Sequence, residues 1–552
     1  MRLHSSCVFL LAACLSCWAA DKTTGTNAAS LPPGARPMAG VGNAHHPVST
    51  KNAQAQMFFD QGLRLIYAFN HEEAAHAFEE AAKLDPQLAM AYWGIAEAVG
   101  PNYNDPASDE RFMEAHKQVQ KAVELSAKAT ASEQAYIAAL AIRFPADTKA
   151  NRKQAAEQYR DAMRKVSQDY PEDLDAATLF AESAMNLRPW ELWNHDATPA
   201  EGTEEIVATL ESVLKRDPNH VGAIHYYIHA VEASSTPERA LAAANRLAAL
   251  APEAGHLVHM PAHVYIRTGD YQAGVTTNQK AAAADEAYMK SGGGTAMYPV
   301  LYYSHNLHFI AACASMNGNY AEASAAAARL MAHVGPHVKE LPPLDAFAII
   351  PMAVDVRFHK WATILASPQP PAERKNSNGY WHFARGMALA ATGKVREAEA
   401  EYKQVMAMRD TISPDEIFAM PVPNKTRNIF TIAVDVLGAK IALAKKDNTG
   451  AIDQLRAAVE VQDSLRYSEP PDWFFPVREM LGGVLLAGGD ATGAEKVFRE
   501  DLQRNPRNPR SLFGLSQALK TQGHEHDAWF VQQEFQASWK GGNSALTVAD
   551  LT

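Results

Sequence analysis

A helix–turn–helix pattern that recurs about every 34 residues constrains this chain more than any other feature of its sequence. Small residues in such a pattern let two helices approach closely, and a proline ends the second helix because it lacks an N–H group. A hairpin of this kind cannot bury its apolar face alone, so successive hairpins must stack. The clearest copy, within residues 55–86, contains Phe58, Gly62, Leu65, Ala74, Phe78, Ala81 and Pro86.

The pattern returns along the chain. The closing prolines Pro218 and Pro252 are 34 residues apart, and a late repeat closes at Pro506. These spacings match the tetratricopeptide repeat (TPR). We therefore expect an all-α solenoid, a right-handed superhelix of roughly nine to eleven hairpins, whose first helices line a concave groove. An unrelated all-α bundle is the alternative.

The length of 552 residues exceeds what one compact core can hold, so the chain must form several domains or an extended array. Two stretches interrupt the period, at residues 101–112 and 188–204, and we expect loops there. The expected parts are a signal peptide (1–20), a flexible lead-in rich in Gly, Pro, Ser, Thr and Ala (21–51), N-terminal repeats (52–218), central His-rich repeats (219–340), C-terminal repeats (341–540) and a tail (541–552).

The first twenty residues have the character of a secretory signal peptide. Arg2 precedes a short apolar run, and small residues follow near Ala19; the run is too short to span a bilayer. Alternatively, Leu11 to Cys14 form a lipobox, which would leave a lipid anchor at Cys14. We expect an exported protein that is periplasmic or secreted, or a membrane-anchored lipoprotein in the second case. No other stretch predicts a transmembrane helix.

Composition excludes several classes of function. After simple cleavage only Cys313 remains, which excludes a disulfide framework. The net charge of -11 argues against a nucleic-acid partner, because phosphate binding requires a basic surface. The sequence also lacks a Walker loop, a dinucleotide fingerprint and a Gly-x-Ser-x-Gly elbow.

Histidine is concentrated in one part of the chain, since seven of the 21 histidines lie between His225 and His308. His225 and His229 are four residues apart, as are His259 and His263, so each pair shares one helix face. The two pairs are separated by 34 residues, and each begins seven residues after a closing proline. They therefore occupy equivalent places on adjacent first helices.

The next hairpin extends this set. A shift of 49 residues, the distance between two inter-helix turns, carries His259 to His308 and His256 to His305. These positions lie away from the packing residues, which predicts that they face the groove. The places equivalent to His229 in earlier hairpins are held by Glu97 and Glu182.

Imidazoles on neighbouring helices, about 10 Å apart axis to axis, can converge on one cation. Imidazole suits Zn, Cu, Fe and Ni, and added carboxylate favours Fe, Zn or Mn. We predict His225, His229, His259, His263 and His308 as ligands of a divalent transition metal, Zn, Fe or Cu. His256 and His305 are alternative ligands or orient the others, and Glu182 or Glu97 is a ligand or the catalytic general base. Either two ions bind, or some histidines serve in acid–base roles.

The alternative is a metal-free groove that binds a peptide or another protein, or histidines that are only structural. A metal site that acts on a small molecule or peptide should be enclosed by the 188–204 loop. It should also bring at least three His nitrogens within about 4–5 Å of one point. Pro261, between His259 and His263, predicts a local kink in the helix.

Several stretches resemble a group of exported bacterial TPR proteins. The similarity covers nearly all of residues 41–540, and it implies the repeat fold and export. That group is named only for its repeats, so the resemblance implies no activity. The stretches that carry it are 59–63, 67–74, 91–94, 225–230, 259–263 and 469–473.

Overall fold

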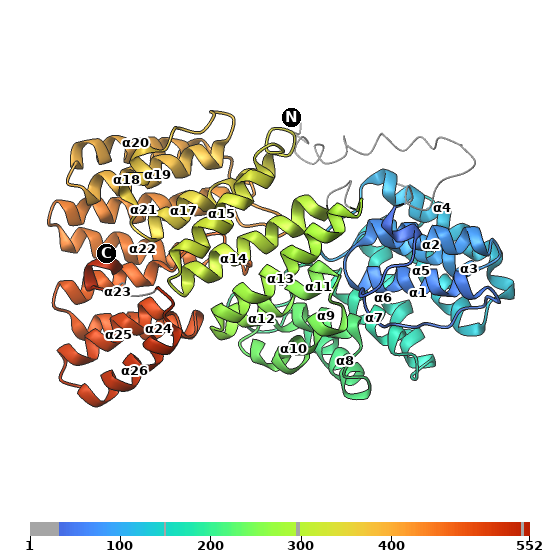
Figure 1. Ribbon diagram of the computed structural model, residues 1–552. Helices are drawn as coiled ribbons and strands as arrows, with labels where there is room; N and C mark the ends of the chain where they lie inside the picture. Colours follow the sequence, from blue (N-terminus) through green and yellow to red (C-terminus); the bar gives the residue numbers. More distant parts are fainter. Residues whose placement is uncertain (1–31, 148–150, 294–297, 542–545) are drawn as a thin grey trace. The chain divides into compact units, whose positions relative to one another are not determined.

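The computed structural model describes residues 32–147, 151–293, 298–541 and 546–552. The predicted signal peptide, the candidate lipidation site Cys14 and the first part of the lead-in lie outside these residues. The chain divides into two units (Figure 1). Unit 1 comprises Met1–Pro189 with Ser291–Gly293, and unit 2 comprises Trp190–Lys290 with Gly294–Thr552. This division falls inside the 188–204 loop.

Unit 1 consists of antiparallel helical hairpins. Its packing follows the small-and-large pattern of the repeat, because the ring of Phe78 on α2 fills the space beside two glycines. A Cβ atom added to Gly62 or Gly94 would lie 2.6 or 2.4 Å from that ring. The helices are α1 (Ala53–Tyr67), α2 (His71–Leu84), α3 (Ala89–Val99), α4 (Asp109–Leu125), α5 (Ala131–Arg143), α6 (Arg152–Asp169) and α7 (Leu174–Met185).

Unit 2 continues with helical hairpins around one large apolar core. Its helices are α8 (Thr203–Arg216), α9 (Val221–Val231), α10 (Leu241–Leu250), α11 (Gly255–His259), α12 (Pro261–Thr268), α13 (Tyr271–Lys290), α14 (Ser304–Met316), α15 (Tyr320–Val334), α16 (Asp345–Ala348), α17 (Ile350–Arg357), α18 (Trp361–Ala366), α19 (Lys375–Ala391), α20 (Val395–Thr411), α21 (Thr426–Ala444), α22 (Asn448–Asp463), α23 (Val477–Ala487), α24 (Ala491–Arg504), α25 (Pro509–Thr521) and α26 (Glu525–Ser538).

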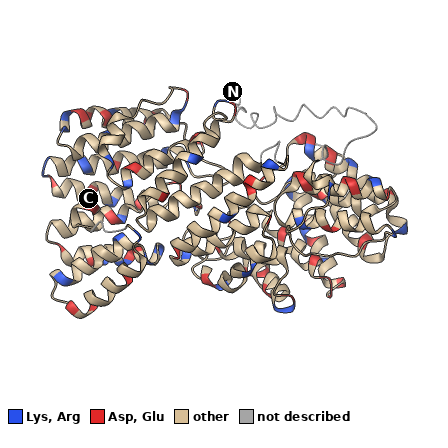
Figure 2. Ribbon diagram, viewed as in Figure 1, with Lys and Arg blue, Asp and Glu red and all other residues tan. Residues whose placement is uncertain are grey.

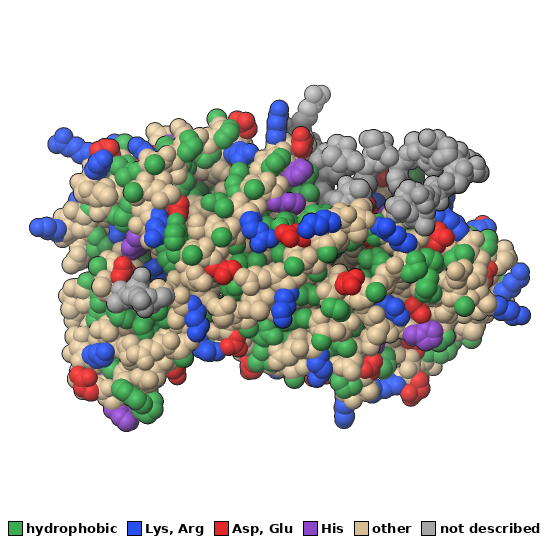
Figure 3. Space-filling view, viewed as in Figure 1, with side chains coloured by type: hydrophobic (Ala, Val, Ile, Leu, Met, Phe, Trp, Pro, Cys, Tyr) green, Lys and Arg blue, Asp and Glu red, His purple; other side chains and the backbone are tan. Residues whose placement is uncertain are grey.

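The prediction of an all-α fold of TPR-type hairpins is confirmed. Among the described residues, β structure is limited to isolated bridges such as that between Trp193 and Pro199. None of the described helices combines the length and apolar character needed to cross a bilayer. Acidic and basic residues are interspersed along the helices (Figure 2), and the face drawn in Figure 3 carries both signs among apolar side chains.

The second part of the lead-in differs from the flexible segment expected over residues 21–51. From residue 32 onward it lies along unit 1, where side chains of the helices hold its backbone. The amide of Gln61 donates to the carbonyl oxygens of Gly34 and Arg36, both at 2.9 Å, and its own oxygen accepts from the N–H of Met38 at 2.8 Å. Composition alone missed this because the partners are buried polar groups on helices farther along the chain.

His46 anchors the same segment across three helices. Its ring lies against Phe59 of α1 and Tyr136 of α5, and its Nδ1 atom lies 2.9 Å from Oδ2 of Asp175 on α7. Burial would lower the pKa of His46, but the hydrogen bond with Asp175 and the nearby aspartates raise it. Three residues farther on, the N–H of Ser49 donates to Glu133 at 2.7 Å.

Candidate metal centre

The candidate site lies in unit 2 on three neighbouring elements. Helix α9 contributes His225 and His229, the broken helix α11–α12 contributes three histidines, and α14 contributes His305. The boundary between the two helices coincides with Pro261: α11 ends at His259 and α12 starts at the proline, while Met260 between them keeps helical dihedral angles, φ -49° and ψ -35°. His259 and His263 therefore still share one face, with ring centroids 4.7 Å apart.

Two groups of three histidines bring their nitrogen atoms together. Each group has its ligand atoms within 4.8 Å of one another. Site A consists of His259, His263 and His305, and site B consists of His225, His229 and His256. A third group, formed by His229, Glu232 and His263, has its ligand atoms equally close together. It links the two sites because it contains one histidine from each.

In site A, Asn278 of α13 determines which nitrogen of His259 carries the proton. The amide nitrogen of Asn278 donates to the carbonyl oxygen of Gly274 at 2.8 Å, so its oxygen faces Nδ1 of His259, at 2.6 Å. Because an amide oxygen can only accept, Nδ1 of His259 is the donor. In the neutral ring, Nε2 then carries a lone pair.

Two carboxylates act on His263 in the same way. Its Nδ1 atom lies 2.7 Å from Oε2 of Glu232 and 2.9 Å from Oε2 of Glu469. An ionised carboxylate only accepts hydrogen bonds, so Nδ1 donates and Nε2 is directed elsewhere. The Nε2 atoms of His259 and His263 are 2.7 Å apart. Two lone pairs at this distance repel each other, so the pair requires a shared cation: a proton carried by His263, or a metal ion bound by both rings.

Burial and charge set the protonation of these groups. Burial, followed by the neighbouring histidines, lowers the pKa of His256 and of His305 well below the ordinary value. Burial would also lower the pKa of His263, but Glu232 and Glu469 raise it to about 10. For Glu232 burial would raise the pKa, yet His229 and His263 lower it to about 2. Burial also lowers the pKa of His229 and His259, so these four rings favour the neutral form that binds metals, whereas His263 favours the charged form.

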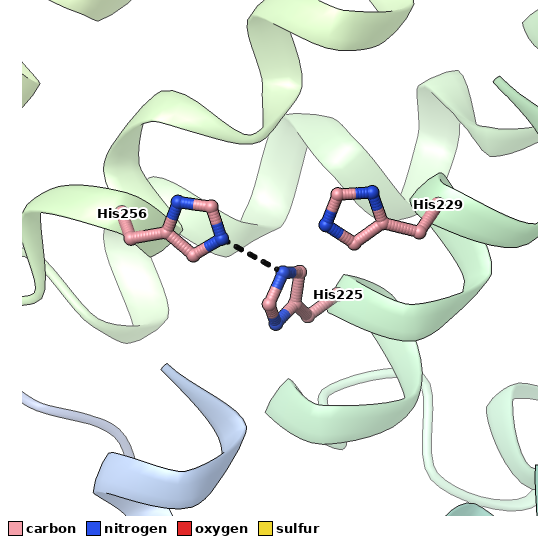
Figure 4. A group of neighbouring side chains, drawn as sticks. All are labelled: His225, His229 and His256. Atoms are coloured by element: carbon pink, nitrogen blue, oxygen red, sulfur yellow. Dashed lines mark hydrogen bonds between the residues drawn. The ribbon is translucent and has the colours of Figure 1, made fainter. Parts of the chain in front are cut away.

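Site B is drawn in Figure 4, where the rings of its three histidines are turned toward one another. The Nε2 atoms of His225 and His256 are 3.1 Å apart. The Nδ1 atom of His229 lies 3.0 Å from Oε1 of Glu232, the carboxylate whose other oxygen contacts His263. One carboxylate thus orients a histidine of each site.

The cluster is buried rather than exposed along an open groove. His225, His229, His256, His259 and His263 are each at most 2 % exposed. Aromatic rings cover them. Trp190, from the 188–204 loop, lies edge-on to His229 with ring centroids 5.7 Å apart, and Phe309 of α14 lies against His259 at 4.7 Å. The indole N–H of Trp193 in the same loop donates to the carbonyl oxygen of Ala230 at 2.8 Å.

His308 lies apart from these groups. Its ring stacks on Phe474 and meets Phe347 edge-on, with centroids 6.2 and 5.7 Å away, and burial lowers its pKa to about 3. His305, considered only as an alternative, joins site A. The 49-residue shift is a spacing along the chain, and such a spacing does not determine which side of α14 packs toward α11 and α12.

The two predicted carboxylates belong to unit 1. Glu97 forms a buried ion pair with Arg143 at 3.0 Å, and the hydroxyl of Tyr159 lies 3.4 Å from its carboxylate. Glu182 accepts a hydrogen bond from Asn186, and burial together with the charge of Glu97 raises its pKa to about 8. Within unit 1, Glu97 and Glu182 thus interact with Arg143, Tyr159 and Asn186. The carboxylates that contact the histidines of unit 2 are Glu232 and Glu469.

Sequence reasoning missed Glu232, Glu469 and Asn278. Glu232 follows His229 by three residues, so helical spacing could have found it on the same face. Glu469 lies in the stretch that carries the family resemblance, but more than 200 residues of sequence separate it from His263. Nothing in the sequence marks Asn278. Glu469 also borders a cavity of about 180 Å³ whose other lining residues include Arg267, Trp473 and Phe475.

Comparisons with known proteins found only distant structural neighbours. No family model matches the chain, and no curated protein matches it. Among solved structures, a human IFIT1 dimer with PPP-AAAA is 13% identical, covers 88% of this chain and 91% of its own, and has a TM-score of 0.32. The APC/C hetero-tetramer Cut9-Hcn1 is 11% identical, with coverages of 92% and 77% and a TM-score of 0.29. The TPR domain of P58(IPK) is 11% identical, with coverages of 86% and 99% and a TM-score of 0.21. At these values none of them bears on the function of this chain.

Proposed function

We propose that this protein binds a transition-metal ion at site A and uses it in chemistry on a small molecule. The observation that carries the proposal is the convergence of His259, His263 and His305, whose ligand nitrogens all lie within 4.8 Å of one another. Asn278 and the two glutamates hold both Nδ1 atoms as donors, so both Nε2 atoms are turned toward one point. Hydrogen bonds from Nδ1 to carboxylate or amide oxygen are the usual support of metal-binding histidines.

His305, the third histidine of site A, favours a metal ion over a shared proton as the cation between His259 and His263. A proton shared by two rings needs no further ligand, whereas His305 adds a nitrogen to the same group. Three imidazoles at about 2.0–2.1 Å from an ion leave an open position for water or substrate. An all-imidazole set favours Zn, Cu or Fe.

Site A has an apolar wall and a small cavity nearby. Phe309 lies against all three histidines, with ring centroids 4.7, 5.1 and 5.0 Å from those of His259, His263 and His305. Glu469, which contacts His263, also lines a cavity of about 180 Å³ with charged and aromatic walls. A bound metal ion can polarise a substrate or lower the pKa of a bound water, and the size of the cavity restricts the substrate that we propose to a small molecule.

Elemental mass spectrometry tests the proposal. The purified protein, and apo protein incubated with Zn, Cu or Fe, are compared with His259→Ala/His263→Ala. The control is His308→Ala, which removes a half-buried imidazole outside both sites. Bound metal that is lost in the double variant and kept in the control is the expected result. Wild-type protein that stays metal-free in all incubations would refute the proposal and would mean that His259 and His263 share a proton.

A second function, peptide binding, is favoured by unit 1. There residues 46–49 lie across α1, α5 and α7, held by Asp175 and Glu133. A groove that holds one extended segment can hold another. A labelled peptide that copies residues 41–51 should bind His46→Ala/Ser49→Ala protein more tightly than wild type, because the internal segment competes less. Equal binding by the two proteins would argue against this function.

We also propose that the protein works outside the cytoplasm, since residues 1–20 have the character of a signal peptide. Mass spectrometry of the mature N-terminus tests this. Cleavage after Ala19 or a lipid on Cys14 would support export by one of the two routes, and an intact Met1 would contradict it.

A further inference from the structure

We infer that site B holds a second transition-metal ion, so that the centre is dinuclear. This inference rests on the proposed function of site A. Site B presents the same donor set as site A, three imidazoles from two neighbouring elements, and its chemistry suits the same class of ions, Zn, Cu or Fe.

The geometry of site B is that of converging ligands. His225 and His229 are one turn apart on α9, and their ring centroids are 4.9 Å apart. His256 approaches from α11, with its ring 4.9 Å from that of His225 and its Nε2 atom 3.1 Å from the Nε2 atom of His225 (Figure 4). All three side chains are buried, at 2 % exposure or less.

A shared ion would use the three nitrogens of site B together. Each neutral imidazole offers one lone pair, and an ion bound by three nitrogens engages one lone pair of every ring, as in His-ligated metal sites.

Glu232 joins the two sites. Its Oε1 atom lies 3.0 Å from Nδ1 of His229, and its Oε2 atom lies 2.7 Å from Nδ1 of His263. The same carboxylate therefore directs Nε2 of one ligand in each site. The rings of His229 and His263 are neighbours, with centroids 5.5 Å apart. Two ions held in this way can act on one substrate that lies between them, such as a bridging water or a small oxyanion.

The number of bound ions tests the inference. Full-length apo protein is loaded with Cu(II), desalted and analysed by elemental mass spectrometry for ions per chain. The variants change only residues that belong to one site: His225→Ala/His256→Ala for site B and His259→Ala/His305→Ala for site A, with His308→Ala as the control. We expect two ions in wild type and in the control, and one ion in each site variant.

Electron paramagnetic resonance provides a second readout that does not depend on counting ions. Two Cu(II) ions side by side couple and lose part of their signal, so each site variant should show a full mononuclear signal per copper and wild type a weaker one. If either alanine pair misfolds by circular dichroism, the corresponding glutamine pair replaces it.

The outcomes separate the two proposals. Wild type with no metal would refute the proposed function of site A as well. One ion in wild type, unchanged in His225→Ala/His256→Ala, would overturn the dinuclear centre and leave site A standing. Two ions that persist in the site B variant would place the second ion elsewhere and would also overturn it.

Discussion

The carboxylate of Glu232 accepts a hydrogen bond from Nδ1 of His263 across 2.7 Å, although the two residues are 31 positions apart in the sequence. The bond joins the end of α9 to α12, and both side chains are buried. It gives His263 one defined orientation and makes Nε2 the nitrogen that faces His259.

Replacing this carboxylate should weaken metal binding without unfolding the protein. Glu232→Gln keeps the size of the side chain but loses the charge and one acceptor, so metal affinity should fall about 10–100-fold. Competition with a chromogenic chelator measures the change. Glu238→Gln, an exposed glutamate nearby in the chain, is the control and should bind metal like wild type. Equal affinities in the two variants would mean that Glu232 does not support a ligand.

A buried ion pair in unit 2 should control stability. The guanidinium of Arg357 on α17 contacts both oxygens of Glu479 on α23, at 3.1 and 3.0 Å, and the two side chains are 1% and 6% exposed. Arg357→Met leaves a buried carboxylate without its cation and should cost about 3–5 kcal/mol. Urea unfolding measures the loss. Arg357→Met/Glu479→Leu should recover much of it, and a double variant no more stable than the single one would contradict the pairing.

The packing of Phe78 predicts that substitutions at Gly94 and Phe78 have non-additive effects on the stability of unit 1. In Gly94→Val the added Cβ would lie 2.4 Å from the ring of Phe78, which is fully buried. Overpacking of this kind should cost about 1–3 kcal/mol. Phe78→Leu frees part of the space, so the double variant should be more stable than the sum of the single effects by about 0.5–3 kcal/mol. Strict additivity in urea unfolding would show that the two positions do not contact each other.

The stability of unit 1 should depend on pH through His46. The contacts with Asp175 and other aspartates raise the folded pKa above the usual 6.5, against the effect of burial. A raised histidine pKa contributes stability that is fully present below about pH 6.5 and is lost as pH rises through the folded pKa. Hydrogen bonds to charged groups contribute about 1.5–3 kcal/mol. Limited proteolysis around residues 41–50 should therefore be slower at pH 6 than at pH 8.5.

Asp175→Asn is the matched variant for this pH test. It keeps the shape of the side chain and removes the charge, so most of the difference in cleavage rate between the two pH values should disappear. Because the protease itself responds to pH, the rates are normalised to an unstructured peptide. A pH difference that persists unchanged in the variant would assign the effect to another group.

Much of the fold can be predicted from local patterns in the sequence. The small, aromatic and proline positions of the repeat are local patterns, and they predict the hairpins because each acts within one or two helices, as Phe78 does with Gly62 and Gly94. The histidine pairs at i and i+4 and the helix break at Pro261 are likewise local, and helical geometry alone relates them to one face.

The lead-in and the choice between His305 and His308 required the structure. Residues 32–50 are rich in Gly and Pro, yet they are held by polar groups of the helices, Glu73 among them, and by burial of Ala35 and Val41. The repeat spacing pairs His308 with His259, but the packing of α14 brings His305 to site A, and no spacing along the chain encodes that packing.

The sequence by itself determined the helical repeats and the concentration of histidines on three successive elements, because both arise from spacing along a helix. Only the tertiary structure decided which nitrogens meet. Asn278, Glu232 and Glu469 come from separate elements, the last more than 200 residues away from His263, and their hydrogen bonds select the proton-bearing nitrogen of each ring. Such selection depends on distances between elements, and these are set by packing rather than by position in the chain.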